Sequence, residues 1–178
     1  MKKIIFCFSL SVFLFSCNND EKKDETTTTT SNTDKPAVDL PYTASYSSSW
    51  STDVSDADLK MVLMSYKDWA DGNMKGLESA IGDSIAVDFS SGGHFSGLKA
   101  DLMKTWSTLR DSLSSVAIDM GGWHKMYSTD KKDGFIVTWY KEIDTYKIGK
   151  VDSAWYHDIN MVKNGKITWY SQYKRPAK

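Results

Sequence analysis

Three histidines and one aspartate carry the most evident acid–base chemistry in this sequence: His94, His124, His157 and Asp88. Imidazole titrates near neutral pH, so a histidine can donate a proton, accept one or bind a metal ion. The three histidines are scattered without the short ligand spacing of a metal site, and no phosphate-binding glycine loop or nucleophile motif is present. The sequence therefore predicts no metal and no cofactor, and leaves His157 and Asp88 as the candidate catalytic groups.

Asp88 ends a short apolar run, residues 85–89, that is typical of a strand. Buried beside aromatic rings, its carboxyl group would have a raised pKa, as a general base working near neutrality needs. The alternative is an aspartate exposed in the turn that follows. The two alternatives differ in where the side chain lies, which depends on the elements around it.

The N-terminus has the pattern of an export signal. Lys2 and Lys3 precede an apolar run over residues 4–15. That run is shorter than the roughly 20 residues that a membrane-spanning helix needs, and a short apolar run behind a positive start is typical of a secretory signal peptide. Residues 1–16 are therefore predicted to be cleaved, with an uncleaved anchor as the alternative.

Leu14 to Cys17 resemble the lipobox of bacterial lipoproteins, although Phe15 is bulkier than the usual residue. The thiol of Cys17 would receive a diacylglyceryl group, and several acyl chains give stable membrane attachment. A chance cysteine after an ordinary signal is the alternative. Because Cys7 would leave with the signal, the folded part would hold no free thiol and no disulfide. We expect a membrane-anchored lipoprotein on the periplasmic face or the cell surface.

A polar segment over residues 17–51 begins with the lipidated cysteine. Its charged start at residues 18–25 and its threonine run at residues 26–30 cannot bury enough apolar surface to fold. We expect a disordered tether, whose acidic start resembles the export signals of Bacteroidetes-type surface lipoproteins or is a solvated spacer. Tyr42, Tyr46 and Trp50 favour docking of its last part on the domain.

The charge balance excludes one class of partner. The whole chain has a formal net charge of −1, and removal of Lys2 and Lys3 makes it −3. Nucleic-acid-binding domains need a basic face, so no nucleic acid is expected.

Residues 52–178 are predicted to form one domain that begins with helices. Ser55 to Asp58 form a capping box, apolar residues from Leu59 to Ala70 recur at helical spacing, and Gly72 is a helix end. A short second helix carries Met74, Leu77 and Ile81 inward and ends at Gly82. A third helix starts near Leu98, after a strand over residues 85–89 and a loop over residues 90–93.

Four strands follow the helices, at residues 116–127, 135–146, 151–162 and 167–173. Gly121-Gly122 indicates a bulge in the first of them, and Asn164-Gly165 is typical of a tight hairpin. Helices followed by a long meander favour an α+β fold, with three helices on one face of a curved, mainly antiparallel sheet.

Two stretches carry a family resemblance: Tyr66 to Asn73 followed by Gly82 to Ile85, and His157 to Ile167. With Gly97 before the third helix, they resemble the opening and the closing hairpin of nuclear transport factor 2-like and SnoaL-like proteins. The resemblance implies a cone-shaped fold with a cavity between helices and sheet. SnoaL-like cyclases, ketosteroid isomerases, dehydratases and pure binding domains share that fold, so it does not imply one function.

Alternation along the strands predicts which residues face this cavity. We expect His157 and Ile159 to point inward together. Two-residue turns at Ile148-Gly149 and Asn164-Gly165 would place Tyr140 opposite His157 and Tyr170 opposite Ile159. The expected lining residues are mainly aromatic: Tyr66, Trp69, Trp106, Tyr140, Trp155, Ile159 and Tyr170. Such a lining would suit a small apolar molecule.

The resemblance also implies roles for single residues. His157 matches the oxyanion-stabilising acid of ketosteroid isomerases, and Asp88 or its neighbour Phe89 matches their general base. Tyr66 lies one position from their helical tyrosine, which on a helix is about 100° of rotation; the isomerase triad is therefore not intact. The alternatives are a His157 satisfied within a half-polar core and a Tyr66 that belongs to the core.

The opposite face of the sheet is predicted to carry an apolar patch, which usually marks an interface. It would serve for a homodimer, or the segment from Tyr42 to Trp50 would cover it. Its expected members are Tyr156, Asn160, Val162, Ile167, Trp169 and Tyr173.

Three functional hypotheses follow. A membrane-tethered module binding a small apolar molecule or a partner needs no catalytic group. A SnoaL-like or isomerase-like enzyme needs His157 and Asp88 in one cavity. An interaction protein that uses only its convex face needs no cavity.

Overall fold

The computed structural model describes residues 39–177, and its compact unit begins at Pro41. The predicted signal peptide, Cys17 and the larger part of the predicted tether lie outside the described residues. No helix within the described residues is long and apolar enough to cross a membrane. The elements are β1 (Trp50–Ser51), α1 (Asp56–Asp71), α2 (Met74–Ala80), β2 (Ile81–Asp88), β3 (His94–Leu98), α3 (Lys99–Asp111), β4 (Leu113–Ser128), β5 (Asp133–Tyr146), β6 (Val151–Lys163) and β7 (Lys166–Pro176).

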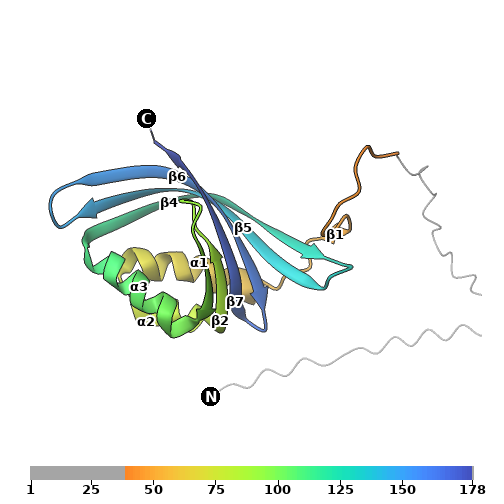
Figure 1. Cartoon of the computed structure of the whole chain (residues 1–178), viewed down its shortest axis with the longest axis horizontal. Helices are drawn as coiled ribbons and strands as arrows, with labels where there is room; N and C mark the ends of the chain where they lie inside the picture. The colour runs from red at the N-terminus through yellow and green to blue at the C-terminus, as the bar shows by residue number, and fades with distance from the viewer. Residues whose placement is uncertain (1–38, 178) are drawn as a thin grey trace, which may run out of the picture. The chain divides into compact units, whose positions relative to one another are not determined.

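All the strands belong to one curved sheet in the order β1-β4-β5-β6-β7-β2-β3. Every neighbouring pair is antiparallel except β2 and β7. The three helices lie on the same side of this sheet (Figure 1), which we call the helix-facing side; the opposite side is the outer face. The predicted α+β architecture is confirmed.

The sequence signals at the ends of α1 act as expected. The Ser55 hydroxyl accepts the backbone N–H of Asp58 at 3.0 Å and donates to its carboxylate at 2.7 Å. Gly72 ends the helix with a φ of 73°, in the left-handed region that glycine adopts without strain. These caps fix where α1 begins and ends, and hence which of its residues face the sheet.

The second helix ends one residue earlier than predicted, because Ile81 is already the first residue of β2. The sequence also gave no sign of β3, which follows the predicted loop and pairs with β2 from Ser84↔Leu98 to Asp88↔His94. Ser96 and Gly97 have weak strand propensity, so pairing with β2 decides the conformation of this edge strand.

The connection between β5 and β6 sets the faces of both strands. We predicted a two-residue turn; instead Lys147–Gly149 form a three-residue loop, in which the N–H groups of Tyr146 and Gly149 bond at 2.8 Å to the carbonyls of Lys150 and Tyr146. Gly149 has a φ of 84°. Tyr140 therefore lies opposite Tyr156 rather than His157. A one-residue slip in register moves every side chain to the other face.

A bulge in β7 changes the next pairing. Val162 pairs with Ile167, as a tight Asn164-Gly165 turn requires, but Met161 pairs with Trp169, so Thr168 is the extra residue. Tyr170 consequently lies opposite Asn160 and not opposite Ile159. The bulge predicted at Gly121-Gly122 is confirmed by the shift between Met120↔Tyr140 and Gly122↔Trp139.

The last part of the predicted tether packs on the domain. Trp50 and Ser51 form β1 against β4, and the Tyr46 hydroxyl donates to the Asp133 carboxylate at 2.6 Å. The rings of Tyr46 and Trp50 lie 6.1 and 5.9 Å from the ring of Phe135. Tyr42, in contrast, is 87% exposed. Docking was thus expected correctly for Tyr46 and Trp50 but not for Tyr42.

Candidate functional site

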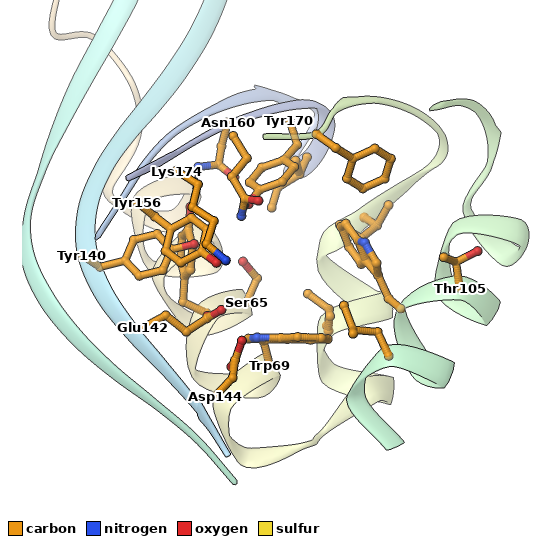
Figure 2. Close-up of a pocket in the computed structure, with 18 of the residues that line it drawn as sticks. Ser65, Trp69, Thr105, Tyr140, Glu142, Asp144, Tyr156, Asn160, Tyr170 and Lys174 are labelled. Atoms are coloured by element: carbon orange, nitrogen blue, oxygen red, sulfur yellow. Dashed lines mark hydrogen bonds between the residues drawn. The ribbon is translucent and has the colours of Figure 1, made fainter. Parts of the chain in front are cut away.

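A cavity of about 320 Å³ lies between the three helices and the helix-facing side of the sheet (Figure 2). Aromatic rings and aliphatic side chains form most of its wall, and polar groups gather on the part built by β5, β6 and β7. The lining residues are Ser65, Tyr66, Trp69, Leu77, Ile81, Phe89, Thr105, Trp106, Leu109, Tyr140, Glu142, Asp144, Tyr146, Asp152, Tyr156, Asn160, Ile167, Tyr170, Gln172 and Lys174.

Five of the predicted lining residues do line this cavity: Tyr66, Trp69, Trp106, Tyr140 and Tyr170. The rings of Tyr66 and Tyr140 meet edge to face at 5.0 Å, and those of Trp106 and Tyr170 at 6.2 Å. Such contacts between α1 or α3 and the sheet hold the rings in place. The aromatic character expected of the cavity is therefore present.

The inward orientation predicted for His157, Trp155 and Ile159 is wrong. They share a face, but it is the outer face, because the three-residue loop before β6 shifts the register by one. The imidazole of His157 stacks on Trp139 with centroids 5.1 Å apart and planes 15° apart. Its Nε2 atom is buried without a hydrogen-bond partner. His157 therefore cannot reach a molecule in the cavity.

Asp88 does not face the cavity either. Its carboxylate bonds to Nδ1 of His94 at 2.7 Å and accepts the indole N–H of Trp169 at 2.9 Å, and the side chain is 45% exposed. The bond from His94, followed by that from Trp169, lowers the pKa of Asp88, whereas a base poised near neutrality needs a raised pKa. Phe89, its neighbour, lines the cavity instead.

Asp158, which was not predicted from the sequence, is a buried carboxylate on the helix-facing side. Its Oδ2 atom accepts hydrogen bonds from the hydroxyls of Tyr140 at 2.7 Å, Tyr170 at 2.8 Å and Tyr66 at 3.1 Å. Complete burial raises its pKa to about 7, while the three hydroxyls act in the opposite direction. The carboxylate therefore ties α1, β5 and β7 together behind the cavity wall.

Further polar groups complete this network. Asn160 donates to the Tyr66 hydroxyl at 3.0 Å and to the Ile136 carbonyl at 3.2 Å, and Thr138 bonds to the same Tyr66 hydroxyl at 2.8 Å. Tyr66 thus belongs to the core and to the cavity wall at once. Buried polar groups are tolerated where they are hydrogen-bonded; Asn160 and Oδ2 of Asp158 meet this condition, whereas Oδ1 of Asp158 is buried without a partner.

Glu142 is a second buried carboxylate, and it lines the cavity with only 8% of its surface exposed. Burial raises the pKa of Glu142 to about 8, and the nearby charges of Asp144 and Asp158 add to the rise. The indole N–H of Trp69 and the ammonium group of Lys174 oppose it. A carboxyl group of this kind can hold or release a proton near neutral pH.

The remaining charged groups of the wall come from β5, β6 and β7. Lys174 lies 3.0 Å from Oδ2 of Asp152, and its ammonium group is 5.6 Å from the ring centroid of Tyr156. The bond from Lys174 lowers the pKa of Asp152, whereas burial raises that of Asp144. Figure 2 shows Glu142, Asp144 and Lys174 directed toward the same space.

No group of three or more histidine, cysteine or acidic side chains in residues 39–177 is arranged to hold a metal ion. The side chains that line the cavity supply carboxyl, phenol, indole and ammonium groups.

Comparison with solved structures identifies the fold. An epoxide hydrolase of the LEH-like type from M. tuberculosis superposes with a TM-score of 0.57 at 10% identity, over 67% of this chain and 83% of that one. A putative dehydratase of the NTF2-like family from Streptomyces avermitilis gives 0.56 at 11%, over 68% and 99%. An NTF2-like protein of unknown function from Burkholderia xenovorans gives 0.52 at 16%, over 69% and 86%.

The domain therefore has the nuclear transport factor 2-like (NTF2-like) fold that the sequence resemblance implied. No family profile and no curated protein sequence matches the chain. At these identities the structural likeness establishes the fold and leaves the activity to the site itself.

Proposed function

We propose that this domain binds a small, largely apolar molecule in the cavity between its helices and its sheet. The observation that carries the proposal is the cavity itself: about 320 Å³, walled by aromatic rings, with polar groups on one side. Ligand sites commonly combine an apolar wall with a few converging polar groups. The hydrogen bonds to Oδ2 of Asp158 support a preformed wall, because they hold the rings of Tyr66, Tyr140 and Tyr170 that a ligand would contact.

Native mass spectrometry of the purified full chain tests this proposal. We expect a bound small molecule in the wild type and its loss in Leu109→Trp, which enlarges a half-exposed side chain of the cavity wall. Met64→Trp is the matched control, because Met64 is also half-exposed and is not a lining residue. The same adduct in Leu109→Trp as in wild type, or no adduct in any variant, would argue against a ligand site here.

We further propose that the protein is a lipoprotein, anchored through lipid on Cys17 outside the cytoplasm. The support is the sequence pattern of residues 1–17. Growth with an alkyne-labelled fatty acid should label the wild-type chain, and Cys17→Ser should abolish the label. Label on Cys17→Ser would contradict the assignment of Cys17.

An enzyme is the second candidate function, and Glu142 favours it. An acid whose pKa is raised to about 8 within a cavity can protonate a bound substrate at neutral pH. An isomerase, cyclase or dehydratase on this chain would use Glu142, since His157 and Asp88 lie elsewhere. Turnover lost in Glu142→Gln with ligand affinity retained would favour this candidate over pure binding.

We also propose a homodimer through the outer face, although its composition differs from the predicted patch. Tyr156, Asn160, Val162 and Ile167 are buried instead. The support is a row of side chains across β5, β6 and β7, Trp139↔His157↔Tyr173, whose outer members are 43% and 58% exposed. Exposed apolar patches often mark interfaces. Trp139→Lys should convert a dimer to a monomer in analytical ultracentrifugation, and a monomeric wild type would refute the proposal.

A further inference from the structure

We propose that the ligand of this cavity carries a cationic nitrogen, and that Glu142 is its counter-ion. The inference rests on the proposed function and adds the chemical class of the ligand. It is carried by three features of the wall: an excess of acidic groups, a buried carboxylate without an ion pair, and aromatic rings beside that carboxylate.

The charges of the wall do not balance. Glu142, Asp144 and Asp152 line the cavity, and Lys174 is the only basic lining residue. Lys174 is paired with Asp152 at 3.0 Å. The nearby guanidinium of Arg110 is committed to backbone carbonyls, with bonds of 2.9 Å to Trp69 and 3.0 Å to Ala70. The wall can therefore accept one more positive charge.

Glu142 is the side chain placed to receive that charge. It is more than nine-tenths buried, and no ion pair to it is found in the described part of the chain. Asp144, two residues along the same face of β5, has a buried Oδ1 atom without a hydrogen-bond partner. A buried carboxylate without a counter-charge is costly, and a cation placed beside it removes that cost.

Aromatic rings surround the same place. Tyr140 and Tyr156 stack with centroids 5.2 Å apart, and Trp69 lies across the space from them (Figure 2). The face of an aromatic ring attracts an ammonium group, most strongly where water is excluded. Carboxylates combined with ring faces fit an alkyl or aryl ammonium ion, whose apolar part would occupy the rest of the cavity.

Binding of a cation should be coupled to release of a proton. The titratable groups that face Glu142 are Asp144 and Tyr140 on its own strand, Asp158 and Tyr156 on β6, and Lys174 and Tyr170 on β7; the indole of Trp69 on α1 also faces it. Burial among them raises the pKa of Glu142 to about 8, which keeps this carboxyl group protonated at neutral pH unless a cation is bound beside it. A cation favours the ionised form, and its affinity should therefore rise with pH.

The experiment compares two probes of similar size, benzylammonium and benzyl alcohol, by isothermal titration calorimetry on the full chain. In the wild type at about pH 8.5, where most of the probe is still the ammonium ion, we expect benzylammonium to bind about tenfold more tightly than benzyl alcohol. The preference should shrink at about pH 6. Near pH 7, titrations in two buffers with different ionisation heats should reveal proton release on binding. Glu142→Gln should abolish both the preference and the release. Glu78→Gln, at an exposed position outside the cavity, should change neither.

Equal affinity for the two probes would overturn the inference while leaving the proposed ligand site in place. A preference retained in Glu142→Gln would also overturn it. Binding of neither probe at millimolar concentration would reject the ammonium class, whereas the adduct measured by mass spectrometry decides separately whether the cavity holds a ligand at all.

Discussion

The two faces of β5, β6 and β7 differ in a way that reverses the usual pattern. The helix-facing side buries Tyr140, Asp158 and Asn160, while the outer face carries Trp139 and Trp155, each more than 40% exposed. Polar groups are thus buried among apolar ones inside, while large apolar groups remain exposed outside. Neighbouring residues on one strand, such as His157 and Asp158, consequently belong to different environments.

This difference shows that hydropathy alone does not decide which residues of these strands are buried. Asp158 is fully buried because three tyrosine hydroxyls converge on one of its oxygen atoms. The apolar outer face is covered at one end by Tyr46 and Trp50. At the other end, Trp139 and Tyr173 remain available for contact with another surface.

The largest expected effect comes from exchanging Asp158 for an apolar residue. Asp158→Leu would leave three buried hydroxyls without their acceptor, and we expect it to lower the free energy of unfolding by roughly 3–5 kcal/mol. His157→Leu, one residue away on the outer face, should change it by no more than about 0.5 kcal/mol, because Nε2 of His157 already lacks a partner. Urea denaturation measures both. Similar losses of unfolding free energy in the two variants would contradict the proposed difference between the two faces.

A change of pH is expected to have a smaller effect on the free energy of unfolding. The folded pKa of Glu142, about 8, lies above its ordinary value of 4.5. Between these values the unfolded chain releases this proton and the folded chain keeps it, so stability falls as pH rises through this window and is level above it. Asp158, with a pKa of about 7, adds to the fall in the same direction.

Glu142→Gln isolates the part of that effect due to Glu142. We expect the stability lost between about pH 5 and about pH 8.5 to be smaller in the variant by about 1–3 kcal/mol. Urea denaturation at the two pH values provides the measurement, with Glu78→Gln as the control. An unchanged loss would mean that Glu142 is ionised in the folded protein throughout this range.

The packing of Trp50 on the outer face should contribute less to the free energy of unfolding. Trp50→Ala removes the ring that contacts Phe135 but leaves β1 paired with β4. Because Trp50 is 41% exposed, we expect a loss of about 1–2 kcal/mol. Thermal unfolding measures this loss, and affinity for a cavity ligand should not change. A changed affinity would show that the two faces are coupled.

The smallest change in stability is expected from a substitution in the β5–β6 loop, whose length decides which face of β6 points toward the helices. Gly149 has a φ of 84° and open space around it, so Gly149→Ala adds backbone strain without a clash. We expect a cost of about 1 kcal/mol with the register retained. Thermal unfolding and the cross-strand nuclear Overhauser contacts between Tyr140 and Tyr156 check this result; contacts between Tyr140 and His157 would reveal a slipped register.

The sequence predicted the architecture well because caps, helical periodicity and the Asn164-Gly165 turn are local signals. The sequence did not predict which face of β6 is inward. Loops of two and of three residues around Gly149 have similar sequences, but they turn opposite faces of β6 toward the cavity. The bulge at Thr168 had no glycine to indicate it. Tyr66, Trp69 and Trp106 were placed correctly, because the helical spacing of apolar residues indicates which side of α1 and of α3 faces the sheet.

Asp158 and Glu142 were missed for a further physical reason. Their burial depends on partners distant in sequence, such as Tyr66 for Asp158 and Trp69 for Glu142. Alternation favoured Ile159 as an inward-facing residue, whereas it lies with Met161 on the outer face beside Tyr46 and Trp50. The alternation of Tyr156, Asp158 and Asn160 was the only sequence signal for a buried polar face.

The most direct test of the helix-facing cavity as the ligand site uses the seven tryptophans of the chain. Their indole N–H resonances, assigned by single Trp→Phe substitutions, report on both faces at once during titration with benzylammonium and benzyl alcohol. The account predicts shifts of Trp69 and Trp106, which line the cavity, with Trp139 and Trp155 unchanged. Shifts confined to Trp139 and Trp155 would contradict it and assign ligand binding to the outer face.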